Sequence, residues 1–200
     1  MKSSLTIFTL LFAASGALAA SVGQLAPAFS AIDVNGKAVT LADYKGKTVV
    51  LEWVNPGCPY VRKHYDSANM QATQKSAAGK QVVWLAVNST HPSQYDYLKP
   101  GDMNAWMKKQ GAAPSATLMD GEGKIGRAYG ARTTPQMYVI DAKGTLVYAG
   151  GIDDTPSANP ADVKAAKNYV NAALGDVLAG KAVAQPVTRP YGCSVKYADS

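Results

Sequence analysis

The sequence is short of the residues that most often carry enzyme chemistry, since its 200 residues include two cysteines and two histidines. Charged residues are also scarce, at 17%, whereas hydrophobic residues make up 47%. A disordered chain shows the opposite balance, so the composition predicts one folded domain with its own core. Lysine and arginine give a net charge of +6 but form no block or stripe, which argues against a nucleic-acid-binding surface. No H-E-x-x-H zinc pattern occurs, and we expect neither a metal nor a cofactor.

The first 19 residues, MKSSLTIFTLLFAASGALA, have the pattern of a secretory signal peptide. Lys2 gives a positive start, an apolar stretch covers residues 5–14, and residues 17–19 form an A-x-A cleavage signal. A membrane anchor is the alternative, but a spanning helix needs about 20 apolar residues and this stretch soon becomes polar. We therefore expect cleavage after Ala19, a periplasmic or secreted protein, and no stable membrane association. Export would also allow cysteines to pair, because oxidising compartments preserve disulfides.

Hydrophobic patterning indicates an α/β fold. Two near-continuous apolar runs, KTVVLEWVN at residues 47–55 and QVVWLAVN at 81–88, are typical of strands buried on both faces of a parallel sheet. Two hairpins are expected, one over 28–41 that turns at Asn35-Gly36 and one over 133–151 that turns at Asp141-Gly144. Three helices are expected: one from Pro59 to about Gly79, one from an Asp102 cap to Gly111, and a long one from Pro160 to Gly180. This order predicts a mixed central sheet flanked by helices. We expect the domain to cover residues 22–182 and an extended tail to cover 183–200.

The stretch EWVNPGCPYVRKHY, residues 52–65, places Cys58 between a buried strand and a helix that begins at Pro59. The unpaired N–H groups and the positive dipole end of a helix N-terminus favour the thiolate form of a cysteine, which is the nucleophile. Arg62, one turn along, could add positive charge. A buried structural cysteine is the alternative. A partner thiol three residues later is missing because that position is Val61, which leaves Cys193 as the other cysteine of the chain.

The segments VVLEWVNPGCP and TTPQMYVID, together with Glu52 six residues before Cys58, resemble the thioredoxin-like superfamily over residues 24–182. The C-terminal stretch AALGDVLAGKAVAQPVTRPYGCSVKY narrows the resemblance to the redoxins, the alkyl hydroperoxide reductase/thiol-specific antioxidant (peroxiredoxin-like) family. The resemblance implies a thioredoxin-like fold and a cis bond between Thr134 and Pro135 that faces the cysteine. It also implies that the residue before this proline offers backbone hydrogen bonds to a substrate chain.

Two departures from the family pattern bear on the reaction. Peroxiredoxins carry P-x-x-x-T-x-x-C, but Leu51 and Asn55 occupy the proline and threonine positions here. They also lack the threonine–proline loop that this chain keeps. Both facts favour thiol–disulfide exchange over efficient peroxide reduction.

Two charged residues are further candidates for the site. Glu52 shares a strand face with Val50 and Val54, so we expect it to be buried, with a raised pKa that suits proton transfer near neutral pH. A partly exposed or salt-bridged glutamate is the alternative. Arg132, just before the threonine–proline loop, could approach Cys58 and stabilise its thiolate, or form a structural ion pair. The two histidines offer a weaker alternative, a metal site with Cys58, but we expect His64 on a solvated helix face and His91 in a loop.

Cys193 supplies the second thiol in our hypothesis, in which the tail folds back over the sheet. The pair could be reversible, with Cys193 as resolving cysteine, or a static disulfide, or Cys193 could remain unpaired. Three functions follow: an exported thiol–disulfide oxidoreductase that uses Cys58 and Cys193, a thiol peroxidase for hydroperoxides, and a non-catalytic binding domain with an inert disulfide. We expect a thiol or disulfide protein, or a small hydroperoxide, as the partner.

Overall fold

The computed structural model describes residues 19–200, so the expected signal peptide lies, apart from its last residue, outside the described part of the chain. Within that part, no helix combines the length and the apolar character that crossing a membrane requires.

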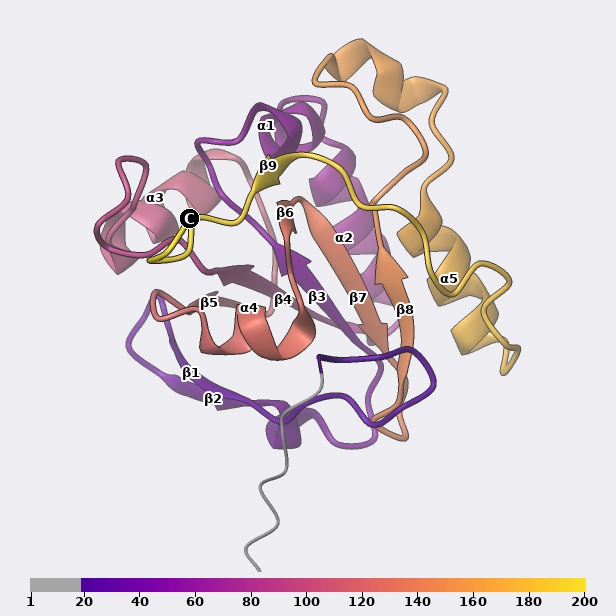
Figure 1. Cartoon of the computed structure of the whole chain (residues 1–200). Coiled ribbons are helices and arrows are strands. Elements are labelled where there is room, and N and C mark those ends of the chain that lie inside the picture. Colours follow the sequence, from indigo (N-terminus) through magenta and orange to yellow (C-terminus); the bar gives the residue numbers. More distant parts are fainter. Residues whose placement is uncertain (1–18) are drawn as a thin grey trace, which may run out of the picture.

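A seven-stranded mixed sheet forms the centre of the molecule, which confirms the expected α/β fold (Figure 1). Its strands in spatial order are β2 (Ala38–Thr40), β1 (Ser30–Asp33), β5 (Ala116–Met119), β4 (Val83–Asn88), β3 (Val49–Trp53), β7 (Gln136–Ile140) and β8 (Leu146–Gly150). The three central strands β5, β4 and β3 run parallel, as their apolar sequences require, and the flanking pairs are antiparallel. A separate two-stranded sheet joins β6 (Thr133–Thr134) to β9 (Cys193–Ser194).

Two apolar layers bury the sheet. The helices α1 (Pro59–Asp66), α2 (Asn69–Gly79), α3 (Pro100–Lys109) and α5 (Tyr169–Leu178) contribute to the layer on one face, which includes Cys58. The short helix α4 (Lys124–Tyr129) packs on the other face, where Val195 of the tail completes the core. Cys58 therefore belongs to the main core rather than to a surface loop.

Three helix predictions need correction. The helix expected from Pro59 to Gly79 is broken into α1 and α2, because Ala68 has a left-handed backbone (φ 59°). The next helix begins at Pro100 rather than after Asp102, since proline fits the first helical position. The last helix starts only at Tyr169, where the Asn168 side chain caps it; the preceding Pro160–Lys164 turn is a separate 3₁₀ helix. The strand β5 and the helix α4 were not anticipated.

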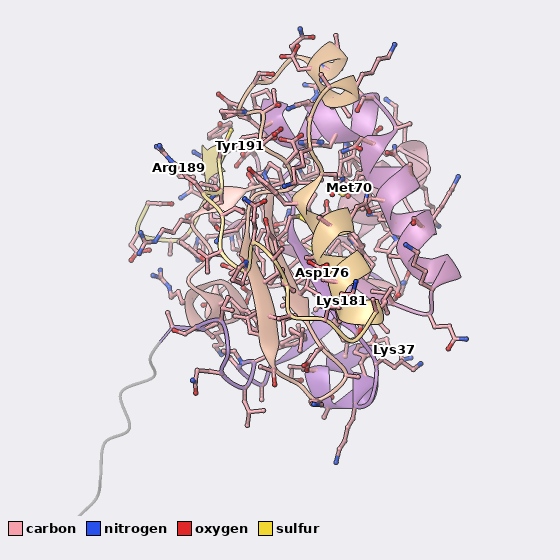
Figure 2. All side chains as sticks on the ribbon, turned by 90° about the vertical axis from the view of Figure 1, so that its right-hand side faces the viewer. Lys37, Met70, Asp176, Lys181, Arg189 and Tyr191 are labelled. Carbon is pink, nitrogen blue, oxygen red and sulfur yellow. The ribbon has the colours of Figure 1, made fainter. Side chains whose placement is uncertain are left out.

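The tail is bound to the body along its length, not free. After α5 it follows β8, where the Ala149 amide donates to the Pro186 carbonyl (3.0 Å) and the Thr188 amide donates to the Ala149 carbonyl (3.2 Å). Figure 2 shows the tail passing from Lys181 beside α5 to Arg189 and Tyr191 at the other end of the sheet.

Glycines on the body make room for this tail. A Cβ on Gly150 would lie 2.1 Å from the Thr188 hydroxyl, and a Cβ on Gly126 would lie 2.3 Å from the Tyr197 hydroxyl. Tyr197 then donates a hydrogen bond to the Ala131 carbonyl (2.8 Å). The tail positions are therefore specified by close contacts that a larger side chain would prevent.

Candidate active site

The loop after β3 delivers Cys58 to the start of α1, as the sequence indicates. Cys58 is the N-cap residue, Pro59 follows at the first helical position, and Cys58 is only 2% exposed. The Asn55 side chain organises this loop: its oxygen accepts from the Gly57 amide (2.7 Å), and its amide donates to Asp96 (2.8 Å). Sequence reasoning treated Asn55 only as a missing threonine, because its partner Asp96 lies 41 residues away and leaves no local signal.

The loop before β7 faces the cysteine. The bond between Thr134 and Pro135 is cis, which agrees with the resemblance. The Cys58 thiol donates a hydrogen bond to the Thr134 carbonyl, with an S···O distance of 3.0 Å. The loop and the cysteine, 76 residues apart in the chain, therefore form one site.

The tail brings Cys193 to the same place. β9 runs antiparallel to β6 in a register that sets Cys193 opposite Thr134, the residue whose carbonyl accepts from Cys58. Both cysteines are free thiols in this structure. Burial, and after it the neighbouring Cys58, raise the pKa of the Cys193 thiol. This arrangement keeps the proton on Cys193. Val61, at the position of a local second thiol, is fully buried in the core.

Gly192 allows this approach. It has a φ of 126°, and a Cβ there would lie 2.0 Å from the Thr134 carbonyl oxygen, which is closer than any side chain permits. The residue before Cys193 must therefore be glycine for the tail to pair with β6.

Glu52 is completely buried in β3, as expected, and is surrounded by donors. Its carboxylate accepts from Tyr65 Oη (2.7 Å), Trp84 Nε1 (2.7 Å) and Gln74 Nε2 (3.2 Å). Burial raises the pKa of Glu52 to about 7, and the three hydrogen bonds oppose part of that rise. Neither cysteine is among its hydrogen-bond partners in the described chain.

The raised pKa makes stability depend on pH. Between pH 4.5 and about 7 the folded protein keeps a proton on Glu52 that the unfolded chain has released. The free energy of unfolding therefore falls as pH rises through this range and levels off above about pH 7. Glu52→Gln mimics the protonated form, so we expect it to remove about 2–3 kcal/mol of the difference in unfolding free energy between pH 5 and pH 8.

Urea unfolding of both proteins at the two pH values measures this difference. An unchanged pH dependence in Glu52→Gln would show that Glu52 titrates normally in the folded protein. The same variant should slow disulfide exchange near pH 7 while the protein remains folded; unchanged exchange kinetics would remove Glu52 from the mechanism.

The structure also places the remaining candidates from the sequence, which are Arg132 and the two histidines. The Arg132 side chain is exposed, and within residues 19–200 it makes no hydrogen bond or ion pair; its backbone carbonyl instead accepts from Val195 of the tail (3.0 Å).

His91 lies in the loop after β4, as expected. The expectation for His64 is wrong, because His64 is fully buried, and so is its neighbour Lys63, at 1% exposed. Their partner, Asp153, is about 90 residues away in the sequence.

Comparisons with known proteins show the family and the fold of the chain. A family model described as the AhpC/TSA family matches residues 22–149. The chain is 26% identical to the thiol-disulfide oxidoreductase ResA of Bacillus thuringiensis over 126 residues, which are 63% of this chain and 67% of that protein. An uncharacterised conserved protein from Geobacillus kaustophilus has a similar structure, with a TM-score of 0.75 and 27% identity over 90% of this chain and 94% of its own. The thioredoxin domain of a thiol-disulfide oxidoreductase from Bacteroides vulgatus, 21% identical over 64% of this chain and 87% of its own, shares the fold with a TM-score of 0.52.

Proposed function

Because the chain belongs to the AhpC/TSA family and is a thiol-dependent oxidoreductase of thioredoxin-like fold, we propose that it exchanges disulfides with protein partners through Cys58 and Cys193. Cys58 is the nucleophile in this proposal and Cys193 is the resolving thiol. The observation that carries it is the register of β9, which sets Cys193 opposite the residue that contacts Cys58.

The reaction has two balanced steps. The Cys58 thiolate attacks one sulfur of a client disulfide, which forms a mixed disulfide and releases the other client sulfur as a thiolate. Cys193 then loses its proton and attacks Cys58, which releases the second client sulfur and leaves a disulfide between Cys58 and Cys193. The client gains two electrons and two protons, and the enzyme loses them; the reverse sequence oxidises a client dithiol.

The surrounding residues support each step. The helix N-terminus at Cys58 stabilises negative charge on a sulfur, and the Thr134 carbonyl orients the Cys58 thiol. Glu52, with its pKa near 7, is our candidate for taking up and returning a proton, through Tyr65 or water. Arg132 contributes through its backbone, which holds the tail.

We also propose that the protein works outside the cytoplasm after removal of residues 1–19, with a domain at 22–182 and a functional tail at 183–200. The support is the signal-like N-terminal sequence and the use of a reversible disulfide, which oxidising compartments favour.

The pairing is tested by peptide mapping of oxidised protein without reductant. We expect one linked pair of peptides that contains Cys58 and Cys193, and its loss after treatment with dithiothreitol. Absence of this pair from the oxidised protein would overturn the resolving role of Cys193. A linked pair that glutathione cannot reduce would instead identify an inert structural disulfide.

The family match favours peroxide reduction as a second candidate function. A hydroperoxide would oxidise Cys58 to a sulfenic acid and leave as an alcohol or water, and Cys193 would condense with the sulfenic acid to give the same disulfide and water. The second-order rate constant of the reduced protein with hydrogen peroxide decides between them. A rate constant similar to that of a free thiol leaves disulfide exchange as the function, whereas one higher by orders of magnitude, and lost in Cys58→Ser, indicates a peroxidase.

A further inference from the structure

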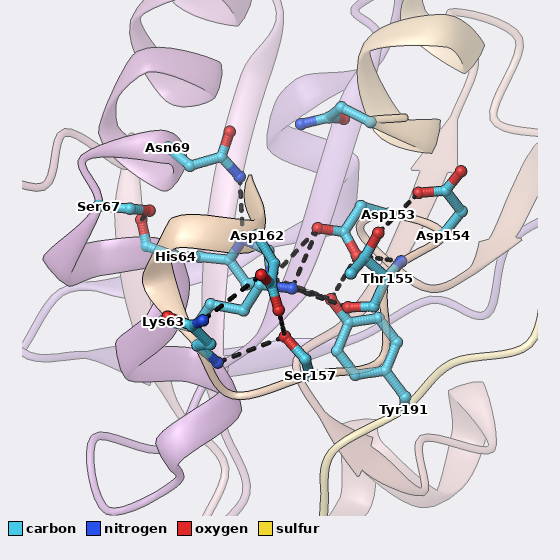
Figure 3. Close-up of polar contacts among 12 residues, drawn as sticks. Lys63, His64, Ser67, Asn69, Asp153, Asp154, Thr155, Ser157, Asp162 and Tyr191 are labelled. Carbon is cyan, nitrogen blue, oxygen red and sulfur yellow. Dashed lines mark hydrogen bonds and ion pairs between the residues drawn. The ribbon is translucent and has the colours of Figure 1, made fainter. Parts of the chain in front are cut away.

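A group of polar side chains has no part in the steps above (Figure 3). It consists of the buried residues Lys63, His64 and Asp153 and the partly buried Tyr191. We call it the buried polar cluster. The Lys63 amine lies 3.6 Å from Asp153 Oδ2, and His64 Nε2 lies 3.8 Å from the same oxygen. Buried ion pairs contribute little net stability compared with apolar packing, but they do fix geometry, because a misplaced partner leaves an unpaired charge.

Tyr191 of the tail completes the cluster. Its hydroxyl donates a hydrogen bond to Asp153 Oδ1 and accepts one from the Lys63 amine (3.3 Å). Its ring packs edge-on against Tyr60 of α1, with 5.9 Å between ring centroids. The tail is therefore joined to α1 by a charged, directional contact.

The His64 ring supplies a third contact to Tyr191. Asn69 donates to His64 Nδ1 (2.9 Å), so the imidazole proton lies on Nε2, which donates to the Tyr191 hydroxyl (3.2 Å). Burial lowers the pKa of His64 to about 4, so the ring is neutral near pH 7. The Tyr191 oxygen thus accepts hydrogen bonds from Lys63 and His64 and donates one to Asp153.

We propose that Tyr191 is a positioning residue that sets the register of β9 and thereby holds Cys193 against Cys58; this inference rests on the proposed function. Lys63 lies on α1, the helix that Cys58 caps, and Tyr191 lies two residues before Cys193. The cluster therefore connects the helix that positions Cys58 to the tail segment that carries Cys193. The pairing of β6 with β9 spans only two residues on each strand, which specifies register weakly by itself. A slip by one residue would turn Cys193 to the opposite face of the strand.

The test is the reaction of the full mature chain with 5,5′-dithiobis(2-nitrobenzoate), which separates the two steps. Cys58 releases one nitrothiobenzoate anion in a bimolecular phase, and Cys193 then releases the second in a unimolecular phase. In Tyr191→Phe we expect the unimolecular phase to slow about 10- to 100-fold, because the variant lacks a hydrogen bond to a buried charge, while the bimolecular phase is not slowed.

Tyr197→Phe is the matched control. It also removes one tail hydroxyl, whose single hydrogen bond goes to the Ala131 carbonyl, but it lies beyond Cys193 and outside the cluster. We expect its unimolecular phase to stay within about twofold of that of the unmodified protein. An unchanged unimolecular phase in Tyr191→Phe, or equal slowing in both variants, would overturn the positioning role.

Two further results keep the test decisive. If Tyr191→Phe does not fold, Tyr60→Leu replaces it. This change removes the ring that packs against Tyr191 and none of the cluster's hydrogen bonds. The unimolecular phase should again slow, and an unchanged phase would overturn the inference. If the unmodified protein itself shows no unimolecular second phase, the proposed pairing of Cys58 with Cys193 fails, and this inference fails with it.

Discussion

The Cys193→Ser protein is expected to react once with a client disulfide and then to stop as a mixed disulfide. Cys58 keeps its place at the start of α1, so the first step proceeds, but no thiol lies opposite Thr134 to resolve the product. Turnover should fall about 100-fold or more, because an external thiol at millimolar concentration must replace one that the fold holds in position. Cys58→Ser should show no reaction above background, since the variant lacks the nucleophile.

Mass spectrometry of each variant after mixing with an oxidised protein client, followed by alkylation, provides the measurement. Cys193→Ser should carry the client as a covalent adduct on Cys58, and Cys58→Ser should carry none. Adduct formation on Cys193 in the second variant would reverse the assigned roles. Normal turnover by Cys193→Ser would exclude the tail cysteine from the reaction.

Gly192→Ala is expected to impair the reaction without changing either thiol. The new Cβ would meet the Thr134 carbonyl oxygen at 2.0 Å, so β9 must leave β6 or shift away from it. We expect the resolving step to slow about 100-fold, because the Cys193 thiol no longer lies in place. The first step should become faster, because Cys58 is only 2% exposed when the tail is bound.

Gly180→Ala controls for the effect of the backbone alone. Gly180 also has a positive φ, of 70°, but a Cβ there has no atom within 4 Å. This variant should lose some stability and keep both rate constants. The same two-phase thiol assay measures the opposite changes that we expect for Gly192→Ala. Slowing of both phases would contradict the expectation that the tail covers Cys58.

The sequence predicts the parts of the site that depend on local patterns. The apolar run that ends before Cys58, with Pro59 after it, is sufficient to place the cysteine between a buried strand and a helix, and Glu52 is buried because its neighbours on the strand face are apolar. The mixed sheet follows from the order of the apolar segments. The cis bond before Pro135 came from the family resemblance, since no local pattern predicts it.

The parts that the sequence does not predict depend on distant partners. Lys63 and His64 lie in α1, where four of the five residues from 62 to 66 are polar or charged, a pattern that is typical of a solvated face. Their burial depends on distant polar partners, which are Asp153, Thr155 and Tyr191. The path of the tail depends on small residues such as Gly126 and Gly150, whose role is visible only when Tyr197 and Thr188 lie against them. Asn55 orders the Cys58 loop through Asp96, a contact without a sequence signal.

The position of Cys193, 135 residues after Cys58, has a consequence for biosynthesis. Ribosomes add about 5–20 residues per second, so Cys58 exists for on the order of ten seconds before Cys193 is made. During that interval each new molecule has a single reactive cysteine, which glutathione or another protein can capture. A chain shortened by premature termination or by a carboxypeptidase would keep this one-thiol chemistry permanently. In the proposed reaction, the synthesis of Cys193 therefore decides whether a molecule completes its own disulfide or remains attached to its partner.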